Sequence, residues 1–231
     1  MKKNFLLLVL CFVVSVAGLV FSCKKDSTPN PTNVGTATSF TEEFQDVYNL
    51  ESRGWVIKDN SSSGSGPYAS WIQGYQGYDK GGVWYGFSAY SYTASPDEFA
   101  YASVTGGSSN YSISSWLITP VLSVKNGDKI SFYTRGDTAG NYTDRMQVLI
   151  NKSSSALVGG TVSSVGGFST TLFDINSTQA IKGYPLIWTK YEYTFSGISG
   201  KTDTRIAFRC FGNNTTNAKG IGIDLFKFQV N

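Results

Sequence analysis

Aromatic side chains are concentrated between Tyr68 and Tyr92, where they could form a ligand-binding surface. This stretch holds nine aromatic residues in 25 positions, whereas aromatic residues make up 15% of the whole chain. Tyr and Trp offer a flat apolar face and a polar edge, which suits sugars and extended peptides. Glycines interrupt the stretch, so part of it should be loop, with rings exposed. The alternative is that half or more of the rings pack the core or anchor loops. The residues that we expect to contact ligand are Trp71, Tyr75, Tyr78, Trp84 and Tyr85.

Acidic residues near both ends of the predicted domain could hold a cation. Glu43 belongs to the sequence Phe-Thr-Glu-Glu-Phe-Gln-Asp, and Asp224 follows Gly-Ile-Gly-Ile close to the carboxyl end. Calcium takes roughly six to eight oxygen ligands, which carboxylates and loop carbonyls of adjoining first and last strands could supply. The pattern therefore allows a structural calcium site.

The surroundings of Asp224 leave other partners open. In a regular strand Asp224 would share its side with Phe226 and Phe228, so its carboxylate would face apolar groups and need a partner. A cation would satisfy it. A hydrogen bond to the backbone, or an ion pair with Arg205 or Arg209, would do so equally well.

The chain contains no histidine, which excludes several classes of site. Ser-His-Asp and Cys-His nucleophilic catalysis need that side chain, and so do the usual imidazole zinc sites. A glycosidase needs only two carboxyl groups beside the bond that it breaks. The 16 acidic residues are an ordinary stock and do not indicate such a pair. We therefore expect no enzymatic activity, with a carboxylate glycosidase or lyase as the less favoured alternative.

The amino-terminal sequence has the layout of a bacterial lipoprotein signal peptide over residues 1–22. Two lysines precede an apolar run over residues 5–21, and Ser22 then leads to Cys23, whose thiol can take a diacylglyceryl group. The alternative is an uncleaved membrane-spanning helix, since the run reaches the lower edge of spanning length. We expect an outer-membrane lipoprotein that is exposed at the cell surface.

The rest of the chain divides into a tether and one domain. Residues 23–38 comprise Cys23 and a polar, proline-containing segment that should be disordered, and residues 39–231 form the domain. Without residues 1–22, 17 basic residues face 16 acidic ones, which gives no support for nucleic-acid binding. Cys210 is the one cysteine left in the domain, and its alternation with Ile206 and Phe208 predicts a buried structural thiol.

Short β-rich runs separated by Gly, Asn, Ser and Asp predict an all-β fold with antiparallel sheets. A helical segment near residues 178–182 would be short. The runs that we expect to be strands are Lys129–Thr134, Met146–Ile150, Trp188–Phe195, Arg205–Phe211 and Gly222–Val230.

Several segments in order along residues 39–231 carry a family resemblance. The most specific are Trp-Leu-Ile-Thr-Pro at residues 116–120 and Ile-Ala-Phe-Arg at residues 206–209, followed by Gly-Ile-Asp at residues 222–224. With Phe40–Phe44 and Gly54-Trp55, they resemble the choice-of-anchor J domain of Bacteroidetes surface proteins. That family is similar to the cleaved adhesin domains of gingipains and, more distantly, to MAM-like jelly rolls.

The resemblance implies a jelly-roll β-sandwich, galactose-binding-like or MAM-like, displayed outside the cell for adhesion or glycan capture. It also implies calcium where the first and last strands meet, which carries over to Glu43 and Asp224. Gln45 and Leu225 stand where the family commonly has acids, so a site here would have less charge. Trp55 and Trp116 are landmarks of the fold and are expected in the core.

We therefore predict a lipid-anchored, monomeric surface protein whose jelly-roll domain binds extracellular glycan or a host or matrix protein without catalysis. The alternative is an accessory subunit of a polysaccharide-uptake complex, which would bind other proteins. Neither interpretation involves nucleic acid, and the cofactor that we expect is structural calcium.

Overall fold

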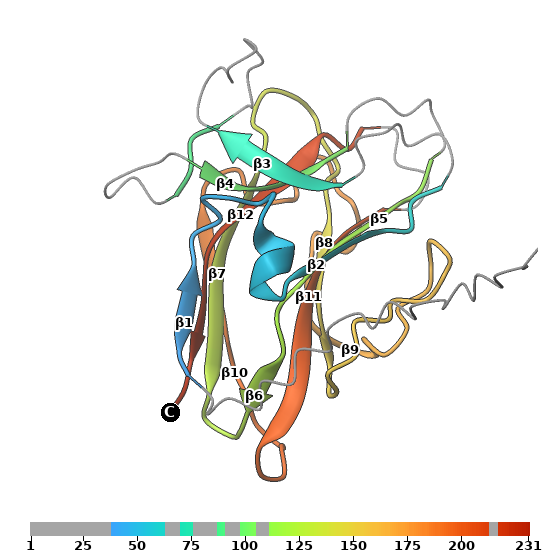
Figure 1. The fold of residues 1–231 in the computed structure, drawn as a ribbon. Coiled ribbons are helices and arrows are strands. Elements are labelled where there is room, and N and C mark those ends of the chain that lie inside the picture. Colours follow the sequence, from blue (N-terminus) through green and yellow to red (C-terminus); the bar gives the residue numbers. More distant parts are fainter. Residues whose placement is uncertain (1–37, 63–69, 76–86, 91–97, 105–110, 213–216) are drawn as a thin grey trace, which may run out of the picture. The chain divides into compact units, whose positions relative to one another are not determined.

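Two antiparallel sheets of six strands each face one another in a computed structural model of the chain (Figure 1). The structure describes residues 38–62, 70–75, 87–90, 98–104, 111–212 and 217–231. They lie in the compact unit Val34–Asn231. None of the helices among these residues is long and apolar enough to span a membrane. The predicted all-β jelly-roll sandwich is confirmed.

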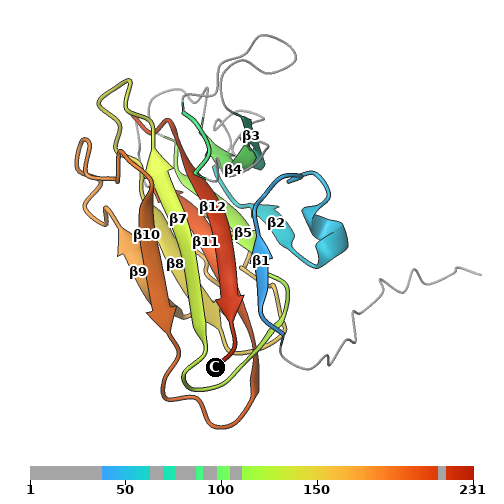
Figure 2. The same ribbon diagram turned by 90° about the vertical axis from the view of Figure 1, so that its left-hand side faces the viewer.

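The first sheet is turned toward the viewer in Figure 2. Its central strand β12 pairs with β7 on one side, and with β4 and β1 on the other. The strands, in order, are β10 (Thr189–Thr194), β7 (Lys129–Gly136), β12 (Gly220–Gln229), β4 (Glu98–Ser103) and β3 (Trp71–Tyr75), with β1 (Phe40–Glu42) beside β12.

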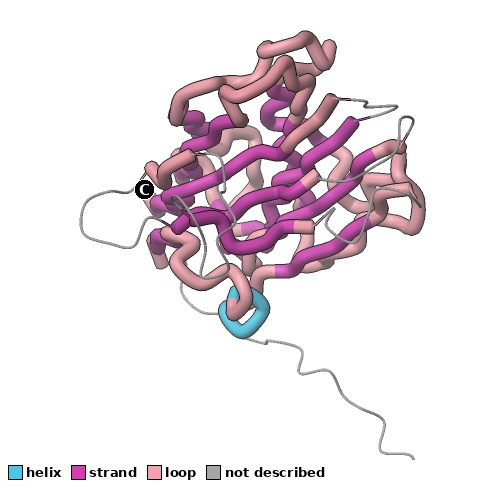
Figure 3. Tube along the Cα trace, turned by 90° about the horizontal axis from the view of Figure 1, so that it is seen from above, coloured by secondary structure: helices cyan, strands magenta, loops and turns pink. Residues whose placement is uncertain are grey.

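The second sheet is centred on β11, which pairs with β5, β8 and β6. Its strands, in order, are β2 (Val56–Asp59), β5 (Ile113–Ile118), β11 (Thr202–Gly212), β8 (Met146–Asn151) and β9 (Thr170–Ile175), with β6 (Leu122–Val124) beside β11. The 3-10 helix η1 (Leu50–Arg53), cyan in Figure 3, is the one helix within the described ranges.

The five predicted strands are present with small changes at their ends, as β7, β8, β10, β11 and β12. The short helix expected near residues 178–182 is absent. That segment forms turns, and Gln179 and Lys182 have φ angles of 52° and 56°. These left-handed values are incompatible with a right-handed helix.

The core between the sheets follows from strict alternation along the strands. In β7 the side chains of Ile130 and Phe132 are buried in the core, while the residues between them face outward. In β11 the side chains of Ile206, Phe208 and Cys210 are buried in the same core. Cys210 is a free, buried cysteine, as predicted, and burial raises the pKa of its thiol well above the ordinary value.

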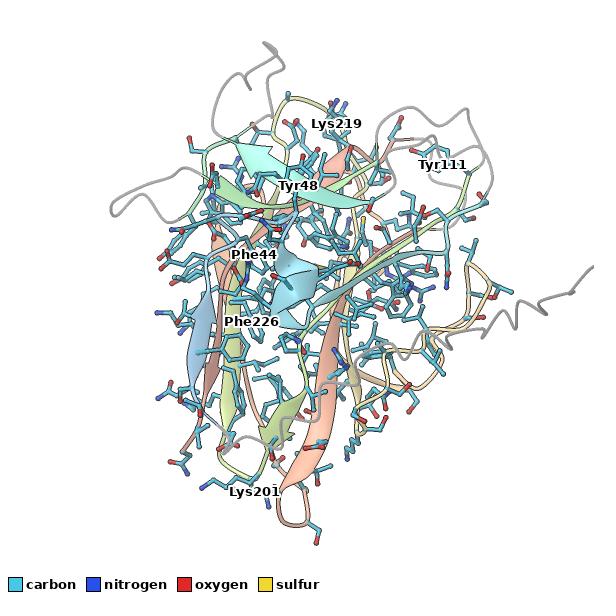
Figure 4. The ribbon with its side chains drawn as sticks, in the orientation of Figure 1. Phe44, Tyr48, Tyr111, Lys201, Lys219 and Phe226 are labelled. Atoms are coloured by element: carbon cyan, nitrogen blue, oxygen red, sulfur yellow. The ribbon has the colours of Figure 1, made fainter. Side chains whose placement is uncertain are left out.

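Aromatic rings join the first sheet to the η1 segment. Trp55 packs edge-on against Phe44 and Phe226, with ring centroids 5.4 Å and 5.5 Å away. Phe44 and Phe226 are labelled in Figure 4. Phe226 also contacts Phe208 of the second sheet at 5.9 Å. Burying a side chain of this size stabilises the fold by roughly 1.5–3 kcal/mol.

The outer face of the second sheet is covered by the connection between β8 and β9. Val158 and Phe168 from this connection pack on Trp116 and Leu149. Trp116 is fully buried, so both Trp55 and Trp116 belong to the packed interior, as expected. This coverage leaves the outer face of the first sheet as the one to consider for binding.

Arg209 crosses the covered face as a buried cation. Its guanidinium lies 4.7 Å from the Trp116 ring centroid and 3.8 Å from that of Phe211. It donates hydrogen bonds to Ser114 Oγ and Gln147 Oε1, both at 3.0 Å. Burial lowers the pKa of Arg209 to about 10, so it remains charged at neutral pH and holds the surrounding strands in register.

Asp144 should make stability depend on pH. Burial raises its pKa to about 7, although Oδ1 accepts hydrogen bonds of 2.9 Å from the N–H groups of Lys219 and Gly220. Between about pH 4 and about pH 7 the folded state therefore holds a proton that the unfolded chain has lost. We expect the free energy of unfolding to fall as pH rises through this window. Urea titrations at several pH values should show a flatter dependence for Asp144→Asn, and an unchanged slope would contradict this assignment.

Candidate functional site

A β-bulge in β12 decides which side of the first sheet Asp224 faces. Asp224 pairs with Tyr133 and Lys227 pairs with Ser131, so β12 uses one more residue than β7 over this step. The extra residue is absorbed at Leu225, whose φ is 48°. Asp224 therefore lies on the outer face with Tyr133, whereas Phe226 points into the core.

This orientation corrects the expectation that Asp224 shares its side with Phe226 and Phe228. A regular strand would place them together, but the extra residue reverses the alternation. Asp224 is fully buried on the outer face. Its Oδ2 accepts the Tyr90 N–H at 3.0 Å and its Oδ1 accepts the Leu225 N–H at 2.7 Å. The expected hydrogen bond to the backbone is thus present.

An aromatic cluster covers the outer face above Asp224. We use the name aromatic cluster for Phe87, Tyr90, Phe99, Tyr101, Tyr133 and Trp188. Phe87 and Phe99 stack at 5.0 Å, and Trp188 meets each of them edge-on at 5.7 Å. Beneath them lies Gly222, where an added Cβ would come within 2.8 Å of Phe87 and 3.0 Å of Trp188. The missing side chain lets the rings lie directly on the sheet.

Tyr90 and Tyr133 form a stacked pair at the edge of the cluster. Their ring centroids are 3.6 Å apart and their planes are inclined by 16°. A side-chain hydrogen bond with Tyr133 is the main cause that raises the pKa of Tyr90 above its ordinary value. Both rings are partly exposed. Because Asp224 holds the Tyr90 backbone, the carboxylate positions this pair rather than offering itself to a ligand.

Trp188 and Arg135 fix the other side of the cluster. Trp188 Nε1 donates a hydrogen bond of 2.8 Å to the Ser88 carbonyl, and its ring is partly exposed. The Arg135 guanidinium lies 4.4 Å from the centroid of the Phe87 ring. Three partly exposed rings with polar edges, Tyr90, Tyr133 and Trp188, thus lie on one face of a rigid sheet. Such a surface can stack against a sugar ring or an extended peptide.

Of the five residues predicted to contact ligand, only Trp71 has a side chain in the described part of the structure. Trp71 lies in β3 with its side chain in the core, where it is 2% exposed, so it is not available to a ligand. Tyr75 ends β3, and its side chain is outside the described part of the structure. Tyr78, Trp84, Tyr85 and the lipidation residue Cys23 also lie outside the described residues.

Asp224 does not line the hollow in which Glu43 lies. Glu43 lies in a shallow hollow with Glu42, Asp46 and Arg53, and its carboxylate accepts a hydrogen bond of 3.2 Å from Gln45. Among the described residues, no group of three or more acidic, histidine or cysteine side chains is placed to hold a metal ion. The side chains seen here therefore do not fit the calcium site that the resemblance implies, and calcium binding stays a prediction from that resemblance.

A cleft of about 480 Å³ opens between the edge strands β9 and β10. Its polar side chains already serve the fold. Asp174 accepts two hydrogen bonds from Arg145 and one from Gln147. The Tyr184 hydroxyl is within 2.6 Å of Thr134 Oγ1. These side chains of the cleft are therefore engaged in interactions within the fold.

The sequence interpretation did not select Tyr90, Tyr133 or Trp188 as contact residues, although Tyr90 lies in the stretch rich in aromatic residues. Tyr133 follows the core residue Phe132, so the alternation in β7 places it outward with Ser131. Trp188 directly precedes β10 and lies far in sequence from the stretch rich in aromatic residues. The signal that could have found Tyr133 was an aromatic residue at an outward strand position.

No protein-family model and no curated protein matches this sequence. Three solved adhesin domains are similar in structure. The K1 cleaved adhesin domain of Lys-gingipain from Porphyromonas gingivalis W83 has a TM-score of 0.52 and 17% identity over 84% of this chain and 99% of that domain. The chain shares the fold of these domains. For the K3 domain from the same strain, the TM-score is 0.50 and the identity 17%, over 83% and 98% of the two chains.

The K2 domain of Lys-gingipain gives a TM-score of 0.51 and 16% identity, over 85% of this chain and 100% of that domain. The expected likeness to gingipain cleaved adhesin domains is thus confirmed for the fold. Membership of the choice-of-anchor J family remains a prediction.

Proposed function

We propose that the protein is an adhesin-like surface protein that binds extracellular glycan through the outer face of its first sheet. The observation that carries this proposal is the stacked pair Tyr90–Tyr133 beside Trp188, three partly exposed rings held on a sheet. Rings fixed in this way lose little conformational freedom when a sugar stacks on them. The shared fold with cleaved adhesin domains is compatible with this role. A host or matrix protein is the alternative ligand.

The same face supports binding without catalysis. Glycoside hydrolysis needs two carboxyl groups that flank the bond. Among the residues that the structure describes, two carboxylates lie beside the stacked pair. Asp224 is fully buried and accepts a hydrogen bond from the Tyr90 N–H. Glu192 is engaged with Lys129 at 3.1 Å and Lys190 at 2.8 Å. We therefore assign these carboxylates to positioning and to charge balance.

In this proposal Cys23 carries lipid and residues 24–38 act as a tether that holds the domain away from the outer membrane. A tether of this length could reach up to roughly 50 Å when fully extended. The domain would then be free to turn its binding face toward a ligand outside the cell.

The stacked pair provides the test. We expect the full-length protein to give hits on a glycan array, and Tyr133→Ala to weaken binding on the order of 30-fold, as for a central aromatic contact worth about 2 kcal/mol. Tyr48→Ala is the matched control, because Tyr48 is 72% exposed but lies outside the aromatic cluster. Equal binding by both variants, or hits retained by Tyr133→Ala, would contradict the proposal.

A further inference from the structure

Lysines surround the stacked pair on the outer face of the first sheet. The register places Lys190 of β10 directly opposite Tyr133. On the other side of β7, Lys227 of β12 is opposite Ser131, the next outward residue along β7. Paired residues on neighbouring antiparallel strands lie about 5 Å apart. Both lysine side chains are exposed, so two ammonium groups flank the small Ser131 and the Tyr133 ring.

The charges of Lys190 and Lys227 both act on the Tyr90 hydroxyl. Lys227 and Lys190 each act to lower the pKa of Tyr90, against the hydrogen bond with Tyr133 and the burial that raise it. Because the register places Lys190 opposite Tyr133 and Lys227 opposite Ser131, a ligand stacked on the Tyr90–Tyr133 pair would lie beside both lysines.

The positive charge on this face is only partly balanced. Glu192 pairs with both Lys129 and Lys190, and these hydrogen bonds lower its pKa. The single negative charge of Glu192 is therefore shared between two lysines. Lys227 forms no ion pair within the ranges that the structure describes. Among the described side chains on this face, Lys129, Arg135, Lys190 and Lys227 are cationic, whereas Asp224 and Glu192 are anionic. The chain without residues 1–22 is almost neutral.

We propose that this face selects acidic glycans, with the Tyr90–Tyr133 pair stacked on a sugar ring while Lys190 and Lys227 bind a carboxylate or sulfate group. This inference rests on the proposed glycan-binding function and names its ligand class. Hydrogen bonds between ammonium and carboxylate or sulfate oxygens are charge-assisted and stronger than neutral ones. The rings supply affinity for the sugar, and the lysines distinguish an acidic sugar from a neutral one.

Matched polysaccharides test the role of charge. Polygalacturonate and its fully methyl-esterified form share a sugar backbone and differ in charge, and sulfated and unsulfated chondroitin distinguish sulfate from carboxylate as the preferred anion. We expect the full-length protein to bind an acidic member at least tenfold more tightly than its neutral or less charged counterpart, with the difference shrinking at high salt. Equal affinity for the esterified and free forms would overturn the acidic preference while leaving glycan binding intact.

Charge-neutralising variants test the residues. Lys190→Gln/Lys227→Gln should lose on the order of tenfold in affinity for the acidic polysaccharide and little for the neutral one. The control Lys58→Gln/Lys201→Gln removes the same charge from exposed positions outside this face and should bind like the parent. Equal losses in both double variants, or equally tight binding to duplex DNA, would mean that net charge alone acts and would overturn the inference. An absence of binding to every glycan would overturn the proposed function as well.

Discussion

Replacement of Leu225 by proline is expected to destabilise the fold strongly. Leu225 is the extra residue of the β12 bulge, and its φ is 48°. Proline fixes φ near roughly −65°, so it cannot adopt this conformation. It also lacks the N–H that donates a hydrogen bond of 2.7 Å to the fully buried Asp224. Leu225→Pro should therefore lower the free energy of unfolding by about 2–4 kcal/mol, which urea titration followed by circular dichroism measures.

Replacement of Leu225 by glycine is the matched control for the proline substitution. It suits the φ of 48°, which glycine adopts without steric strain. The Leu225 N–H that binds Asp224 is also kept. We expect Leu225→Gly to fold with a free energy of unfolding within about 1 kcal/mol of the parent. A Leu225→Pro variant that is as stable as Leu225→Gly would contradict the role given to the bulge.

Truncation of Phe226 should produce the largest loss of stability among the single substitutions considered. Phe226 is fully buried and contacts Trp55 of the η1 segment and Phe208 of the second sheet. Phe226→Ala should therefore lower the free energy of unfolding by about 3–5 kcal/mol, because it combines lost burial with a cavity. Phe226→Leu fills most of that volume and should lose much less. Denaturant titration measures both.

Phe226 faces the core and the aromatic cluster faces outward, so stability and binding should separate. At temperatures where Phe226→Ala is folded, its glycan affinity should match that of the parent. Tyr133→Ala should show the reverse, with binding lost and stability little changed. A Phe226→Ala protein that is folded but does not bind glycan would show that core packing controls the binding face, which would contradict this separation.

Strand positions could be predicted from the sequence because the two faces of each strand meet different surroundings. In β7 every second residue from Ile130 is buried, which is the pattern that alternation predicts. The buried thiol of Cys210 follows by the same reasoning. The core position of Trp116 came instead from the family resemblance.

The orientation of Asp224 could not be predicted because no local signal marks the bulge. A glycine often accompanies a positive φ, but here a leucine adopts it. The bulge lies where β12 changes its neighbour from β4, which pairs up to Ile223, to β1, which pairs from Phe226. That change of partner is a property of the whole sheet, and a single strand does not encode it.

None of the five residues predicted to contact ligand belongs to the aromatic cluster, since Trp71 lies in the core and the side chains of the other four are outside the described part of the structure. A high local density of aromatic residues does not separate rings that enter the core, such as Trp71, from rings that lie on the surface, such as Tyr90. The remaining rings come from β7 and from the residue before β10, and the sheet register brings them together. Sequence density points to a function of this kind, whereas the tertiary arrangement selects the residues.

Hydroxyl-radical footprinting with the tightest-binding glycan tests the central claim most directly. The account predicts that bound glycan protects Tyr90, Tyr133 and Trp188 from oxidation, and that the exposed Tyr48 and Leu157 react at the same rate with and without glycan. Protection confined to the cleft between β9 and β10, or to the second sheet, with Tyr133 and Trp188 unchanged, would contradict it.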